Sequence, residues 1–116
     1  MFGLELSSAL VTEARRRLPG LADQIFEGNV IDWCPPHTFK FVRTGLEYVL
    51  AARRPSLVRR LLDQFVAPDG RLIVGPVGRK DLATTIEAFE RVSAPPATSE
   101  RTDRNGKTRY VVWCSV

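Results

Sequence analysis

Apolar residues recur along the chain with two different periods, which separate helical from extended segments. The clearest helical period runs from Pro55 to Val66, where the leucines and valines share one face with Phe65. Pro55 would lie in the first turn of this helix, where a proline is tolerated. Further helices are predicted from Leu6 to Leu18 and from Asp81 to Val92, with a helical turn from Leu46 to Leu50.

Short apolar runs bounded by turn residues, together with the two extended runs that flank Asn105-Gly106, predict six strands. They lie near residues 2–5, 24–28, 38–43, 71–75, 97–103 and 108–115. The run from Arg71 to Gly75 is typical of a strand in a parallel sheet covered on both faces. Strand and helix patterns follow the order β-α-β-β-α-β-α-β-β, which predicts an α/β fold class.

Turn and cap residues punctuate these segments. Ser7 or Ser8 can cap the first helix, and Pro19-Gly20 predicts its end. A turn is predicted at Pro68-Asp69-Gly70. Asn105-Gly106 separates the last two extended runs and predicts an antiparallel hairpin.

The composition fits one globular domain over residues 1–116, with 44% hydrophobic and 26% charged residues. No apolar run approaches the ~20 residues that span a bilayer, and Glu5 interrupts the region where a signal peptide is apolar. We therefore expect a cytoplasmic protein without a membrane partner. Cys34 and Cys114 lack the spacing of a zinc site, so no metal is indicated and both are expected to be buried free thiols.

The net charge of +4 comes mainly from arginine, because the chain holds 14 arginines and 3 lysines. These residues are scattered among acids, and no dense basic tract occurs. The pattern disfavours nucleic acid as a partner. Nucleic-acid binding would require the arginines to converge on one face of the fold.

Four segments have a distinctive order and spacing: Phe2 to Ser7, Gly28 to Trp33, Phe39 to Thr44 and Ala67 to Leu72. Together they resemble the later two-thirds of a class I S-adenosylmethionine-dependent methyltransferase. In that family they would be the second strand and its helix start, the motif after the third strand, the fourth strand, and the turn before the fifth strand. The resemblance covers nearly the whole chain and implies a Rossmann-like, mostly parallel sheet with a C-terminal antiparallel hairpin.

The resemblance also implies a cofactor, S-adenosylmethionine, and residues that would bind it. These residues are Glu5, Leu6, Asn29, Val30, Asp32, Arg43 and Thr44. Glu5 would hold the ribose hydroxyls at its strand end, and residues 29–32 would border the adenine. Tyr48 and His37 would lie on the substrate side, and no catalytic residue is indicated.

Four of these residues also have a simpler structural explanation. Glu5 would be stabilised by the dipole of the helix that follows it. Asn29 and Asp32 would shape a turn through bonds from side chain to backbone. His37, in a proline-rich loop, would act as a general base near neutral pH or would simply be solvated.

The chain departs from the family pattern at two places. The family's first strand and glycine-rich turn would precede Phe2, and Lys40 stands where the family commonly carries an acid. The resemblance is thus to a form shortened at its N-terminus, for which weak or absent cofactor binding by this chain alone is expected. The lost strand lies in the middle of the family's sheet, so its neighbours would have to pair with each other or recruit a strand from another chain. We therefore expect a homo-oligomer.

The sequence leaves two functions open. The first is methyl transfer to an acceptor that the sequence does not identify, if a complete site is assembled. The second is a non-catalytic, homo-oligomeric interaction module that keeps the fold without the cofactor.

Overall fold

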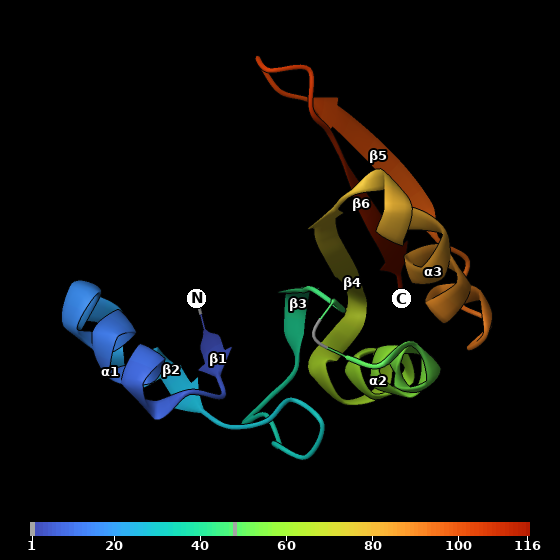
Figure 1. Cartoon of the computed structure of the whole chain (residues 1–116). Coiled ribbons are helices and arrows are strands. Elements are labelled where there is room, and N and C mark those ends of the chain that lie inside the picture. The colour runs from blue at the N-terminus through green and yellow to red at the C-terminus, as the bar shows by residue number, and fades with distance from the viewer. Residues whose placement is uncertain (1, 48) are drawn as a thin grey trace. The chain divides into compact units, whose positions relative to one another are not determined.

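The computed structural model describes residues 2–47 and 49–116. The chain divides into two compact units, Met1–Cys34 and Pro35–Val116 (Figure 1). Each unit has its own β-sheet, of two strands in the first and four in the second. The α/β class predicted from the sequence is confirmed.

The first unit is a strand, a helix and a second strand parallel to the first. It contains β1 (Gly3–Glu5), α1 (Ser8–Arg17), the 3₁₀ helix η1 (Pro19–Gln24) and β2 (Ile25–Glu27). Val11 of α1 and Ile25 of β2 are buried. Arg15 ties the helix to β2, because its Nη2 donates to the carbonyl oxygen of Ile25 at 2.7 Å.

The helix α1, predicted from Leu6 to Leu18, begins at Ser8 and ends at Arg17, between the cap and the stop that the sequence predicts. The Oγ of Ser7 accepts a hydrogen bond from the Leu10 N–H at 3.3 Å, which satisfies one of the unpaired amides of the first turn. At the other end the Leu18 N–H donates to the Ala14 carbonyl, and Pro19 opens the 3₁₀ helix. The predicted cap and end are confirmed.

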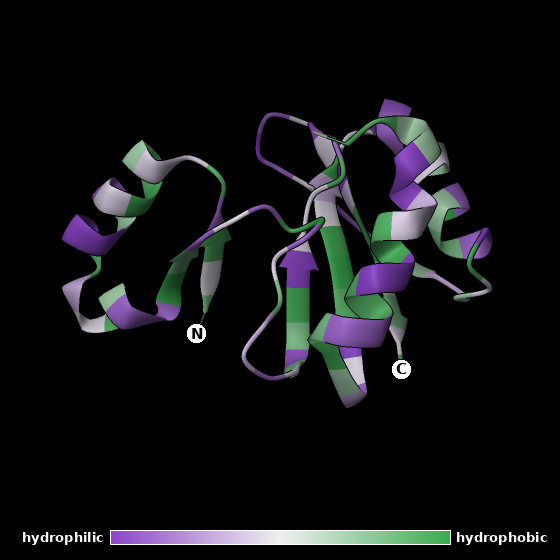
Figure 2. Ribbon diagram, turned by 90° about the horizontal axis from the view of Figure 1, so that it is seen from below, coloured by the Kyte–Doolittle hydropathy of each residue, from purple (hydrophilic) through white to green (hydrophobic). Residues whose placement is uncertain are grey.

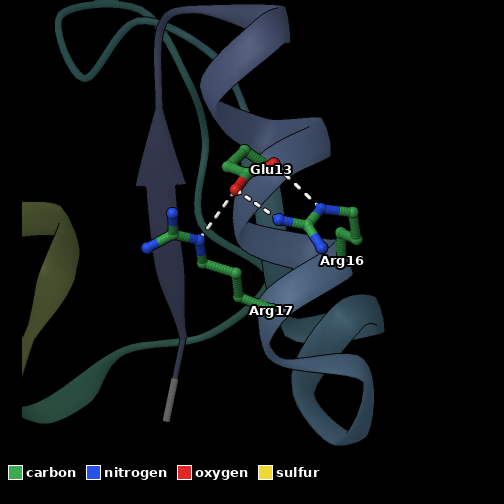
Figure 3. A network of polar contacts seen from close by, with 3 residues as sticks. All are labelled: Glu13, Arg16 and Arg17. Atoms are coloured by element: carbon green, nitrogen blue, oxygen red, sulfur yellow. Dashed lines mark hydrogen bonds and ion pairs between the residues drawn. The ribbon is translucent and has the colours of Figure 1, made fainter.

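An ion-pair network lies on the exposed side of α1 (Figure 3). The Glu13 carboxylate accepts two hydrogen bonds from Arg16, at 2.7 and 3.0 Å, and one from Arg17 at 2.7 Å. The hydrogen bonds from Arg16, which have the larger effect, and from Arg17 lower the pKa of the Glu13 carboxyl group below its usual value. Because these side chains are solvated, the network contributes little to stability.

The second unit is a four-stranded mixed sheet with helices on one face. Its elements are β3 (Phe39–Thr44), the 3₁₀ helix η2 (Ala51–Arg53), α2 (Arg54–Arg60), the π-helical η3 (Leu61–Phe65), β4 (Val66–Val77), α3 (Arg79–Glu90), β5 (Ala97–Thr102) and β6 (Thr108–Ser115). The strand order is β3-β4-β6-β5, with β3 parallel to β4 and the other two pairings antiparallel.

Apolar side chains of the strands and helices meet in one core. Leu72, Val74 and Val112 of the sheet are fully buried, as are Leu61 of η3 and Phe89 of α3. Green apolar segments of β3 and β4 are visible in Figure 2. The residues that alternate with Leu72, Val74 and Val112 along the strands face away from the helices.

Two predicted boundaries in this unit are wrong. The helix predicted to reach Val66 changes to a π-helical turn at Leu61, and Val66 already belongs to β4. The turn predicted at residues 68–70 lies inside β4 as an irregularity. Val66 pairs with Phe39 and Arg71 pairs with Phe41, so β4 advances five residues while β3 advances two. Asp69 absorbs this excess with a φ of 70°.

Further expectations concern the hairpin, a helical turn, the two cysteines and membrane spans. The hairpin between β5 and β6 is confirmed, with Gly106 at a φ of 79°. Residue 48, in the helical turn predicted for 46–50, lies outside the described residues, and the next helical residues are Ala51–Arg53. Cys114 is buried as expected, but Cys34 is exposed, because it lies in the loop that leads out of the first unit. Within residues 2–47 and 49–116, no helix is long and apolar enough to cross a bilayer.

Candidate functional site

Two parallel strands of the first unit end side by side. Glu5, the last residue of β1, pairs with Glu27, the last residue of β2, and the Gly28 N–H extends this pairing to the Glu5 carbonyl at 3.0 Å. Ligands of open α/β sheets bind beyond the carboxyl ends of parallel strands. The edge formed by Glu5 and Gly28 is therefore a candidate ligand site.

The Glu5 carboxylate is held in place by the start of α1. Its Oε1 accepts a hydrogen bond from the Ser7 N–H at 3.2 Å, and the side chain is half-buried. This contact agrees with the simpler explanation, an acid at a helix start. It also fixes the carboxylate at the strand end, where a carboxylate can accept further hydrogen bonds at its second oxygen. Leu6, between these residues, is 68% exposed.

A tight loop follows β2. The Asn29 carbonyl accepts hydrogen bonds from the Asp32 and Trp33 amides at 3.1 and 2.7 Å, and the Asn29 Oδ1 accepts one from the Ile31 N–H at 3.0 Å. The Asn29 side chain thus shapes the turn, as one of the two explanations predicted. Val30 is half-buried, and the Asp32 side chain is exposed.

An aromatic layer lies beside this loop. The Phe2 and Phe26 rings stack at 5.9 Å, and the Phe26 and Trp33 rings lie 5.3 Å apart with a tilt of 43°. A Cβ at Gly28 would lie 2.7 Å from the Trp33 Cδ1, so only glycine fits under the indole. The sequence predicted no binding role for Phe26 or Gly28. The signal that could have identified them is the glycine directly after a strand.

The remaining predicted site residues lie in the second unit. At the end of β3, the Arg43 Nε donates to the Gly75 carbonyl at 3.2 Å, and the Thr44 Oγ1 donates to the Gly45 carbonyl at 3.1 Å. Arg43 and Thr44 are adjacent, and they lie at the carboxyl end of a strand that is parallel to β4.

His37 precedes the other end of the same strand. Its Nδ1 hydrogen-bonds the Thr38 carbonyl at 2.7 Å, and its ring packs 4.5 Å from the Phe39 ring. About 20 Å of extended chain separates His37 from Thr44. The structure therefore does not bring these two residues together. Tyr48, the other residue predicted for the substrate side, lies outside the described residues.

The first unit thus holds Glu5, Leu6, Asn29, Val30 and Asp32, and the second holds Arg43, Thr44 and His37. Among the described residues, no three His, Cys, Asp or Glu side chains are grouped so that they could hold a metal ion.

Solved structures share this fold. A possible exported protein from Bordetella parapertussis matches with a TM-score of 0.69 and 15% identity, over 98% of this chain and 52% of that chain. Precorrin 8W decarboxylase from Methanobacterium thermoautotrophicum matches with a TM-score of 0.67 and 12% identity, over 99% and 69%. An O-methyltransferase from Bacillus cereus, in complex with SAH, matches with a TM-score of 0.66 and 14% identity, over 97% and 61%.

The likeness to structures named as methyltransferases shows the fold, which is the class I methyltransferase-like fold over the part that the chain contains. The chain spans between 52% and 69% of the length of the three structures. No protein-family model matches the chain, and no curated protein matches it in sequence.

Proposed function

We propose that this chain forms the adenosine side of the cofactor site in an S-adenosylmethionine-dependent methyltransferase. The observation that carries the proposal is the Glu5 carboxylate, fixed by the Ser7 amide at the carboxyl edge of β1 and beside the loop that follows β2. Structural likeness to the SAH complex of the Bacillus cereus enzyme, and to other structures named as methyltransferases, supports it. Because one fold hosts many activities, the likeness alone does not assign this one.

The residues of this edge fit an adenosine by their chemistry. A carboxylate at a strand end accepts hydrogen bonds from both hydroxyls of a ribose, which is the use that dinucleotide folds make of an acid there. The exposed Asp32 carboxylate can accept from the adenine amino group, and Val30 offers an apolar contact to the ring.

The cofactor would supply the electrophilic methyl group, and this chain's residues would position it. Glu5 and the loop at residues 29–32, all in the first unit, would fix the nucleoside. No residue of the chain is assigned a proton transfer. The contribution of the protein is orientation and the exclusion of water.

Binding of the cofactor by the 116 residues alone should be weak. Each hydrogen bond exchanged with water contributes only about 0.5 to 1.5 kcal/mol. The chain offers few such bonds to offset the cost of immobilising a flexible ligand. We therefore expect a dissociation constant in the millimolar range.

The test is a titration of the isotope-labelled chain with S-adenosylhomocysteine, followed by amide chemical shifts. Shifts at residues 5–7 and 28–33 are expected, with binding several times weaker in Glu5→Gln because the charged acceptor is lost. Glu90→Gln removes a charge from the end of α3 and should leave binding unchanged. The proposal fails if millimolar ligand shifts no amide in these segments, or if Glu5→Gln binds as well as the parent chain.

The second function, a non-catalytic homo-oligomeric module, is favoured by the open edges of the two sheets. Among the described strands, β1 pairs only with β2, and β3 is the outer strand of the larger sheet, so β1 and β3 do not pair with each other. Unpaired strand edges of this kind can recruit a strand from another chain. This function predicts a dimer or larger species by light scattering at micromolar concentration, together with no amide shifts on addition of the ligand.

A further inference from the structure

One face of the four-stranded sheet carries no described helix of its own unit. Leu72, Val74 and Val112 point into the core beneath α2 and α3. The residues between them on β4 and β6, and those beside them on β3 and β5, point the other way, and none of these is buried. We name this surface the arginine face and define it by six of its residues: Phe41, Arg43, Arg71, Arg101, Arg109 and Trp113.

The strand register places these six residues on one surface. Phe41 lies beside Arg71, and Arg43 and Trp113 both flank Ile73. Arg101 pairs with Arg109 at the hairpin end. From Arg109 to Ser115 the face extends about 20 Å along β6. That length corresponds to about six stacked nucleotides at ~3.4 Å each.

The charge of the arginine face has one sign. In the described strands, no Asp or Glu occupies the register rows that contain its four arginines. Glu100 pairs with Tyr110, which is buried on the helix-covered side. Asp103 is engaged in the hairpin turn, where its Oδ1 accepts hydrogen bonds from the Asn105 and Lys107 amides at 2.8 and 2.9 Å.

A hollow of about 280 Å³ opens at the hairpin end of this face. Arg101, Lys107 and Arg109 line it together with Ser99, and Glu100 and Asp103 also contribute to its wall. The three cations outnumber the two acids in this wall, so the hollow keeps a net positive charge that favours anions such as phosphate.

Aromatic rings accompany the arginines at the other end. Phe41 is 64% exposed, which is unusual for a phenylalanine on a strand. Beside it, the guanidinium carbon of Arg71 lies 4.1 Å from the centroid of the Trp113 ring. Phenyl, guanidinium and indole groups are the surfaces on which unpaired bases stack.

We propose that the arginine face binds single-stranded nucleic acid, with bases on Phe41 and on the Arg71–Trp113 stack and phosphates on Arg43, Arg101 and Arg109. This inference is independent of the proposed methyltransferase function. It meets the condition set by the sequence, since four of the scattered arginines converge on one face. A second copy of the chain is a poorer occupant, because apposing two such faces would bring about eight arginines together without acids.

The test is fluorescence anisotropy of labelled oligo(dT) and oligo(U), each about twelve nucleotides long so that it exceeds the length of the face, titrated with the whole chain at low salt. Binding is expected for at least one of the two strands, and it should weaken steeply as salt increases. Phe41→Ala should weaken it about tenfold, since a stacking platform is lost. The double variant Arg101→Glu, Arg109→Glu should weaken it at least as much and make the salt dependence shallower.

Arg101→Glu and Arg109→Glu are also measured singly, and Arg91→Glu is their matched control, because it makes the same charge change as either one at the end of α3, away from this face. Circular dichroism verifies that each variant keeps its fold. The proposal is overturned if neither oligonucleotide binds, if Arg91→Glu weakens binding as much as the change at either Arg101 or Arg109, or if Phe41→Ala has no effect. It is also overturned if a polyglutamate peptide of similar length competes as well as the oligonucleotides, which would identify the face as a site for acidic protein.

Discussion

Gly28 is the most constrained single position of the candidate site, because the indole of Trp33 occupies the space of a Cβ. Glu5 is also constrained, by the Ser7 amide. Of the two residues, only Glu5 was predicted from the sequence to bind a ligand. An acid after a strand is recognisable along the chain, whereas the packing of Trp33 over a glycine five positions earlier depends on how the loop at residues 29–32 turns back.

Gly28→Ala should destabilise the first unit by about 1 to 3 kcal/mol, since the new methyl group forces the indole or the loop to move. Hydrogen exchange of the β2 amides measures this loss. Gly20→Ala is the control, because a Cβ at Gly20 meets no atom within 4 Å. Equal exchange rates in the two variants would contradict the packing described for Trp33.

The two thiols should differ in reactivity. Cys34 is exposed, while burial raises the pKa of Cys114 above its usual value. Less of Cys114 is therefore thiolate at any pH below that pKa, and the thiolate is the nucleophile. In mildly alkaline buffer iodoacetamide should alkylate Cys34 at least about tenfold faster than Cys114, as followed by mass spectrometry of the peptides. Unfolding in urea should bring the two rates together.

Among the elements, the strands were predicted best. β1, β2, β3, β5 and β6 begin and end within a residue or two of the ranges predicted for them, because alternation and turn residues are local signals. The start of β4 and the π-helical turn at Leu61–Phe65 were not predicted. Both depend on β3, whose pairing with Val66 extends β4 past Pro68 and Gly70.

The β5–β6 hairpin offers a test of a prediction that the structure confirms. Gly106 adopts a φ of 79° and a Cβ there would meet no atom within 4 Å, so Gly106→Ala introduces backbone strain alone. We expect a loss of about 1 kcal/mol in the free energy of unfolding, measured in urea. Gly106→Asn should lose less, because asparagine tolerates this conformation. If both variants were as stable as the parent chain, residue 106 could not hold a left-handed conformation in solution.

Taken as a whole, the chain combines two sheets that each bear part of the predicted site. The composition predicts one domain, and the contacts divide the chain into two units. These statements concern different properties, because compact units within one chain can still unfold together. The topology follows from local patterns, but which strands end up in which sheet depends on pairings between distant residues.

Because each unit contains one tryptophan, fluorescence can measure whether the two units unfold together. Trp33 lies in the first unit against Phe26, and Trp113 lies in the second under the guanidinium of Arg71. Trp33→Phe and Trp113→Phe therefore each leave one emitter that reports on one unit alone. Coincident emission midpoints in urea would mean that the 116 residues fold cooperatively, as the composition predicts. Two separate midpoints would mean that the small β-α-β unit gains and loses its structure independently of the larger one.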